Sequence, residues 1–188
     1  LFRSFMTPAL PEDIDILSRP MTYVTYEVRS TDGKDHRVGA MFSVHPEIAV
    51  NDPGQLVRDS FEMVDNLGVA RVGSVEQPVL QKKGDDLRID WGYLYLAAPE
   101  KKVEVAAKNF EFTSHVSLGN VASWRTNKLY FVPRQPQNSE AVQSPLSAEE
   151  APPITVSFDF RKVGKAPASR WLMLAYDDLY SIQYMKKD

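Results

Sequence analysis

The sequence has no cysteine among its 188 residues. Disulfides, thiolate metal sites and a cysteine nucleophile are therefore excluded together. Positive charge is not in excess, because 22 Lys and Arg stand against 25 Asp and Glu and give a formal net charge of −3. The composition thus lacks the basic excess expected of a nucleic-acid-binding protein. Long apolar runs are missing too, since none approaches the roughly 20 residues that a membrane-spanning helix needs.

What the chain does contain is typical of a globular domain. Hydrophobic residues make up 43% and charged residues 25% of the sequence, and the length suffices for one sizeable domain or two small ones. The chain begins Leu1-Phe2-Arg3 with neither an initiator Met nor a charged-then-apolar leader. We interpret it as a fragment or as a chain already stripped of a leader.

Alternating apolar and polar residues predict a series of strands. Residues 22–30 and 36–45 both alternate, and Asp32-Gly33 between them supplies the positive φ of a tight turn, which predicts a hairpin. Residues 55–63 fit either a strand or a helical turn. Residues 68–81 form a strand run in which Pro78 indicates an edge or a bulge.

The longest alternating stretch is 85–112. Leu87, Ile89, Trp91, Tyr93 and Tyr95 share one parity, which predicts that Trp91 packs in the core. After a turn at 98–101 the alternation resumes. The apolar residues then move from odd-numbered to even-numbered positions, which predicts a β-bulge near residue 109.

Residues 133–153 carry five of the 13 prolines and have a linker-like composition. Only two strands follow, 154–162 and 170–178, and the second is apolar on both faces, as a central strand with a buried Trp171 would be. Because two strands cannot form a domain, we interpret 133–153 as a long loop within a single domain. This loop could contain a short helix that is N-capped by Ser147, with Glu150 completing the capping box.

Together these patterns predict one all-β domain, an antiparallel β-sandwich of the supersandwich kind, with a long Pro-rich internal loop. Residues 1–20 contain three prolines and are predicted to be an extended segment on the surface.

No catalytic motif stands out. The histidines His36, His45 and His115 are scattered, without the spacing of metal ligands, and we assign them structural or surface roles. Three clusters of acids could divide acid–base work or bind calcium: Glu12, Asp13 and Asp15; Asp85, Asp86 and Asp90; and Asp177 with Asp178. Adjacent acids also mark turns, and we favour that interpretation. No catalytic residue, metal ligand or cofactor is predicted.

Aromatic residues offer a candidate ligand platform. Trp91, Tyr93 and Trp124 could stack on sugar rings, as flat aromatic faces of sandwich domains can. The strand phase favours core packing for the first of them.

Three stretches resemble one family: "FMTPALPEDIDILSRPMTYVTYEVRSTDGKDHRV", "VGSVEQPVLQKKGDDLRIDWGYLYLA" and "RWLMLAYDDLYSIQYM". The most specific pieces are Asp90-Trp91-Gly92 and Tyr176-Asp177-Asp178 followed by residues 180–182. Taken in order, the stretches are similar to the N-terminal domain of the glutaminase A family, large exported proteins of fungi and Bacteroidetes.

The resemblance implies a secreted or periplasmic multidomain protein in which a β-sandwich precedes a helical toroid domain. It also implies hydrolysis of L-glutamine to L-glutamate and ammonia by the parent protein, with no catalytic residue carried by this part. The chain would be a non-catalytic support for the downstream domain of the same polypeptide. The alternative is a carbohydrate-binding module whose partner is a glycan.

The segment 176–188 is then the candidate interdomain contact. Tyr180, Ile182 and Tyr184 share one parity and are predicted to touch the downstream domain, while Asp177 and Asp178 fix the exit of the chain. Three desolvated side chains of this size could dominate a modest interface.

Overall fold

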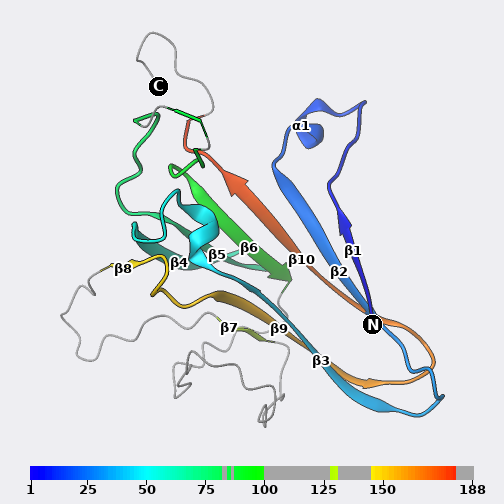
Figure 1. The fold of residues 1–188 in the computed structure, drawn as a ribbon. Coiled ribbons are helices and arrows are strands. Elements are labelled where there is room, and N and C mark those ends of the chain that lie inside the picture. The colour runs from blue at the N-terminus through cyan, green and yellow to red at the C-terminus, as the bar shows by residue number, and fades with distance from the viewer. Residues whose placement is uncertain (82–83, 86, 100–127, 131–144, 181–188) are drawn as a thin grey trace.

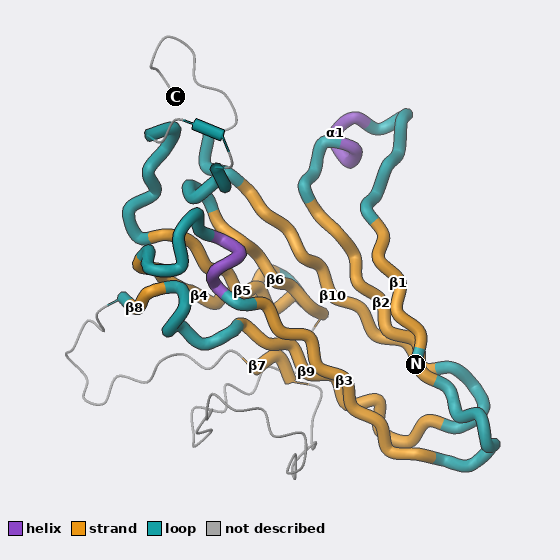
Figure 2. Tube along the Cα trace, in the orientation of Figure 1, coloured by secondary structure: helices purple, strands orange, loops and turns teal. Residues whose placement is uncertain are grey.

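The computed structural model describes residues 1–81, 84–85, 87–99, 128–130 and 145–180. Strands dominate this part of the chain (Figures 1 and 2), and the prediction of an all-β fold is confirmed. The strands are β1 (Phe2–Met6), β2 (Met21–Val28), β3 (His36–Val44), β4 (Leu56–Val64), β5 (Leu67–Ser74), β6 (Tyr93–Pro99), β7 (Lys128–Tyr130), β8 (Leu146–Ser147), β9 (Ile154–Val163) and β10 (Ala168–Asp177). Within the described residues, helix is limited to two short segments, α1 (Ile14–Leu17) and the 3-10 turn η1 (Pro46–Ala49). Neither of these helices has the length or apolar character to cross a membrane.

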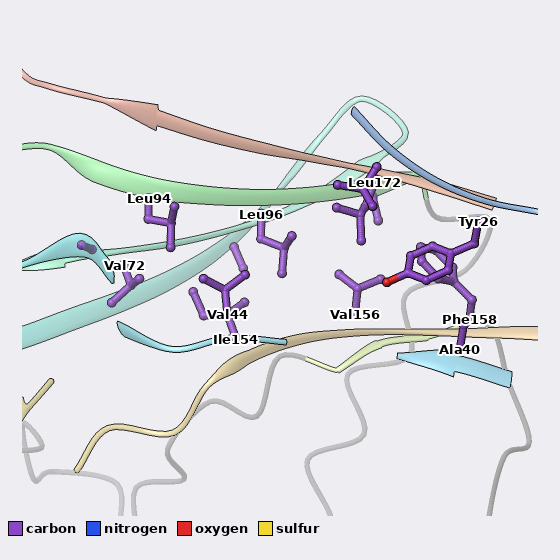
Figure 3. Packing of buried hydrophobic residues seen from close by; sticks show 14 of the residues in the cluster. Tyr26, Ala40, Val44, Val72, Leu94, Leu96, Ile154, Val156, Phe158 and Leu172 are labelled. Carbon is purple, nitrogen blue, oxygen red and sulfur yellow. The ribbon is translucent and has the colours of Figure 1, made fainter. Parts of the chain in front are cut away.

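The strands form two antiparallel sheets that face each other. One sheet has the order β1-β2-β10-β6-β5-β4-β8 and the other the order β3-β9-β7. Apolar side chains from both sheets fill the space between them (Figure 3), with Leu96, Leu172 and Val156 almost fully buried. The sandwich-like arrangement that the alternation predicted is therefore present, and its core lies between the two sheets.

The predicted hairpin between residues 22 and 45 is wrong, although its turn is present. Gly33 has the expected positive φ of +75°, but β2 pairs with β1 and β10, whereas β3 pairs with β9. The turn carries the chain from one sheet to the other, and the β9–β10 connection crosses beside it, where the Ser30 N–H donates to the Gly164 carbonyl at 2.8 Å. Alternating strands can bury their apolar faces across a core as well as side by side, so the pattern could not separate the two outcomes.

The predicted face of residues 85–95 is also wrong. Residues 87–90 are not in a strand, and β6 begins only at Tyr93. Leu94 and Leu96 point into the core, while Leu87 and Ile89 are exposed. The positive φ of Gly92, +109°, interrupts the extended backbone, so the alternation on its two sides does not belong to one strand.

β10 is a central strand, as predicted, flanked by β2 and β6. Its Leu172 is buried, but Trp171 is 36% exposed, which contradicts the predicted burial. Neighbouring residues of a strand point to opposite faces. Leu172 therefore faces the three-stranded sheet, and Trp171 faces away from it.

The ambiguous segments are also settled. Residues 56–64 form β4, and Pro78 lies beyond the end of β5 rather than in a strand. The segment predicted to be extended contains β1, paired with β2, and the single helical turn α1, whose N-cap is Asp13.

Ser147 does not cap a helix. It belongs to β8, which pairs with β4, and its hydroxyl donates to Glu150 Oε2 at 2.9 Å in the turn that follows. The predicted bulge near residue 109 and most of the 133–153 loop lie outside the described residues.

Candidate functional site

A buried carboxylate organises the approach to β6. Asp90 is only 2% exposed, and its Oδ2 accepts a hydrogen bond from Gln55 Nε2 at 2.8 Å. Its backbone carbonyl accepts a second hydrogen bond from Ser74 Oγ at 2.7 Å. The turn before β4, the end of β5 and the start of β6 are thereby joined at one residue. We call Asp90-Trp91-Gly92 the Asp90 corner.

Gln77 holds the other side of the Asp90 corner. Its Nε2 donates to the Ser74 carbonyl at 2.8 Å and to the Gly92 carbonyl at 3.1 Å, and its Oε1 accepts from the Gly92 N–H. The side-chain amide thus satisfies the backbone groups of Gly92 as a neighbouring strand would. Gln77 itself has a positive φ of +47°, so its backbone is bent to bring the amide into place.

The end of β10 rests on the same corner. The Tyr176 hydroxyl lies 3.2 Å from the carbonyls of both Ile89 and Trp91 and donates to them. Burial raises the pKa of Tyr176 to about 12, with smaller contributions from the negative charges of Asp90 and Asp178. The phenol therefore keeps its proton, and with it the hydrogen bond, throughout the neutral range.

Gly92 is where the exit of the chain touches the corner. A Cβ at Gly92 would collide with the Asp177 carbonyl and with Asp178 Cα. The predicted role of these two acids toward a downstream domain stays a prediction, but within the described residues both contact Gly92. The contact is made by their backbone, packed against a glycine, rather than by their carboxylates.

The predicted acid clusters do not assemble a reactive site. Asp85 is exposed while Asp90 is buried, and Asp86 lies outside the described residues. Asp13 caps α1 by accepting from the Ile16 N–H at 3.1 Å, which is a turn role. Among residues 1–81, 84–85, 87–99, 128–130 and 145–180, no group of three metal-binding side chains comes together.

The two described histidines each sit next to a carboxylate on the surface. His36 Nε2 lies 2.8 Å from Asp32 Oδ1, and His45 Nδ1 lies 3.5 Å from Glu47 Oε1. Both pairs are about half exposed and are local in sequence. His115 lies outside the described residues.

Two of the three residues of the predicted aromatic platform, Trp91 and Tyr93, lie among the described residues. Trp91 is half-buried, and within the described part of the chain its indole nitrogen has no hydrogen-bond partner. Tyr93 lies on the outer face of the seven-stranded sheet. The guanidinium carbon of Arg71 lies over its ring, 4.8 Å from the ring centroid. Trp124 lies outside the described residues, as do Ile182 and Tyr184 of the predicted interdomain contact.

A hollow of about 570 Å³ opens between the sheets near the end of β10. Its walls combine apolar and charged side chains from β3, η1, the loop before β6 and β10: Phe42, Ser43, Val44, His45, Glu47, Ile48, Arg88 and Leu174. Leu174 precedes Tyr176 by two residues on the inner face of β10. The hollow therefore adjoins the Asp90 corner.

Several exposed apolar side chains belong to segments at the same end of the molecule. The Tyr176 N–H donates to the Pro20 carbonyl at 3.2 Å, which places the chain leaving α1 beside the end of β10. We call the apolar residues of this end the exit patch: Ile14, Leu17, Ile48, Leu87, Ile89, Leu179 and Tyr180, all more than 40% exposed. Of these, only Tyr180 was predicted as a contact residue.

The residues that build the corner were missed at the sequence level. Gln55, Ser74 and Gln77 carry no motif, and their importance arises from partners up to 35 positions away. Tyr176 stood out only within the stretch that carries the family resemblance.

The chain belongs to the family described as a domain of unknown function, DUF5127, whose model matches residues 3–188. No curated protein and no solved structure matches the chain.

Proposed function

We propose that this chain is a non-catalytic β-sandwich that supports the downstream helical domain of an exported, glutaminase-like hydrolase. In this proposal the parent protein is secreted or periplasmic and converts L-glutamine to L-glutamate and ammonia. The activity and the location rest on the resemblance of the stretches around Asp90-Trp91-Gly92 and Tyr176-Asp177-Asp178 to the glutaminase A family.

The observation that carries the proposed docking role is the exit patch. Ile14 is 75% exposed and Ile48 is 56% exposed, and both belong to segments near the end of β10, which Gly92 and Tyr176 hold in place. Exposed apolar side chains gathered in one area mark an interaction surface more often than single ones do. The downstream domain of this proposal would follow the segment that leaves β10 at this end of the molecule.

The described residues also support the absence of catalysis. The carboxylate of Asp90 is enclosed and hydrogen-bonded, and the two described histidines pair with carboxylates rather than with a hydroxyl nucleophile. Nucleophilic catalysis needs a nucleophile and a base within hydrogen-bond reach. We therefore expect no ammonia release from glutamine by chain 1–188.

The alternative, a carbohydrate-binding module, is favoured by one observation, the exposure of Trp171 on the outer face. However, the ring planes of Tyr23 and Trp171 are inclined by 56°, and those of Tyr93 and Tyr95 by 69°. A flat platform for successive sugar rings would need rings that lie close to one plane. The docking role is therefore the better supported of the two.

The test compares chain 1–188 with a longer polypeptide that continues into the following domain. Leu17→Asp in the exit patch should lower the midpoint of unfolding of the longer protein and leave chain 1–188 almost unchanged. Met63→Asp is the matched control, because Met63 is 44% and Leu17 46% exposed, and Met63 lies on β4. Equal effects of the two substitutions in the longer protein would refute the docking role. Ammonia release by chain 1–188, abolished by a single substitution in it, would refute the non-catalytic role.

A further inference from the structure

β1 is an edge strand with apolar side chains on both of its faces. It ends the order of the seven-stranded sheet, and all five of its residues are exposed. Its register with β2 puts Phe2 and Met6 on the outer face, at 68% and 59% exposure, and Phe5 on the inner face, at 66%. The outer backbone edge of such a strand carries unpaired N–H and C=O groups that can pair with another strand.

The other edges in the described part of the two sheets are protected. β8 has two residues, and β7 has three within the described part of the chain, so both offer only a short edge there. β3 is longer, but its register with β9 shifts between Arg37 and Gly39, and one face of it is already in the core. β1, in contrast, pairs in unbroken register over its whole length and contains no proline and no acidic residue. Of these edges, β1 alone combines five residues in unbroken register with three exposed apolar side chains, and Arg3 is its one charged residue.

The sequence of β1, Phe-Arg-Ser-Phe-Met, is complementary to itself in the antiparallel direction. If two copies meet with Ser4 opposite Ser4, Phe2 of one copy lies opposite Met6 of the other on the outer face. On the inner face, Arg3 lies opposite Phe5. These are a sulfur–aromatic and a cation–π pair, both favourable between neighbouring strands. Antiparallel pairing of identical strands has the two-fold symmetry that most homodimers use.

We propose that β1 is a dimerisation strand, through which a second copy of this chain extends the seven-stranded sheet about a two-fold axis at Ser4. The paired segment is about 17 Å long, which is small for a protein interface, so the dimer should be weak and depend on concentration. This proposal uses β1 and is independent of the exit patch.

The absence of cysteine allows a direct test by cross-linking. Ser4→Cys introduces the sole thiol of the chain at the axis, where the two Cβ atoms would be about 5 Å apart. A short bismaleimide should join two Ser4→Cys chains much faster than two Ser18→Cys chains. Ser18 is the control because it is an exposed serine away from β1. Equal cross-linking rates would overturn the proposal.

A second test uses charge at the same position. In light scattering over roughly 1 µM to 1 mM, the mass of the unaltered chain should rise from 21.3 kDa toward twice that value. Ser4→Lys should keep the chain monomeric by placing like charges opposite each other, and an equimolar mixture with Ser4→Glu should restore the dimer. A chain that is monomeric throughout, a mass that grows beyond the dimer, or a Ser4→Lys variant that dimerises normally would contradict it.

Discussion

Two aspartates of this chain accept hydrogen bonds close to a glycine of positive φ. The partners of one are local in sequence, and the partners of the other are distant. Asp32 lies next to Gly33 in an exposed turn, and Asp90 lies two residues before Gly92 in a buried corner. The carboxylate of Asp32 accepts from the Ser30 hydroxyl, the Lys34 N–H and the His36 ring, all within four residues. Asp90, by contrast, binds groups 16 and 35 positions away.

The difference shows how burial and sequence separation set the importance of a polar residue. The hydrogen bonds of Asp32 stabilise a local turn at the surface, where water could replace any partner that is lost. The Asp90 corner joins β4, β5 and β6, and the end of β10 rests on it. A lost partner there leaves buried polar groups without hydrogen bonds, which costs far more than a lost partner on the surface.

The largest expected effect comes from a matched pair of glycines. Gly92→Ala should destabilise chain 1–188 by about 3 kcal/mol or more, because the new methyl group meets the backbone of Asp177 and Asp178 at a positive φ. Gly33→Ala should cost only about 1 kcal/mol, because its Cβ would meet nothing within 4 Å. Urea denaturation of both variants measures the contrast. Similar losses would show that Gly92 is not under steric constraint.

The second effect concerns the carboxylates themselves. Asp90→Ala should cost about 2–3 kcal/mol, because it leaves the Gln55 amide without its buried acceptor. Asp90→Asn keeps an acceptor oxygen and should lose less. If Asp32→Ala, measured under the same conditions, proves as damaging as Asp90→Ala, the contrast between corner and turn does not hold.

A smaller effect should appear at alkaline pH. The pKa of Tyr176 is raised to about 12 in the folded chain, so above pH 10 the folded state holds a proton that the unfolded state has released. Ionising the phenol therefore favours unfolding, and stability should fall between about pH 10 and pH 12. After allowance for partial exposure, the loss is roughly 1–2 kcal/mol. Tyr176→Phe should flatten this part of the stability–pH curve, and an unchanged curve would assign the loss to other groups.

The smallest effect belongs to the Asp32 turn. The His36 hydrogen bond, followed by those from Ser30 and Lys34, holds the pKa of the Asp32 carboxyl well below its ordinary value. A depressed pKa in the folded state gives stability that is present above about pH 4 and is lost as the pH falls below it. Because the turn is exposed, Asp32→Asn should shift the thermal midpoint only slightly at pH 7. The shift should vanish in acid, and one that persists there would point to a role other than charge.

The sequence predicts where strands lie along the chain better than it predicts which of their faces is buried. The alternation at 154–162 identified β9, and the apolar stretch 170–178 identified the central strand β10. The same reasoning failed for Trp91 and Trp171. Alternation shows which residues of a strand share a face, but it does not show which of the two faces points into the core. Gly92 shows the reason: a single residue with positive φ separates two alternating runs that look continuous in the sequence.

The site was less predictable than the fold. The predicted interdomain contact stays a prediction. Within the described residues, the backbone of Asp177 and Asp178 packs against Gly92, and Gln55, Gln77 and Tyr176 hold the surrounding backbone. The amide of Gln77 acts on Gly92 across 15 positions, and no spacing rule connects the two.

By itself, therefore, the sequence determined the properties that depend on neighbours along the chain: the all-β class, the turn at Asp32-Gly33 and the absence of thiol chemistry. Only the tertiary structure decided that β2 and β3 lie in opposite sheets, that Asp90 is buried and that the segments carrying the exit patch lie at one end. The physical reason is that backbone conformation follows largely from local sterics and periodicity. Pairing and burial depend instead on the free energy of the whole core, to which residues far apart in the sequence contribute together.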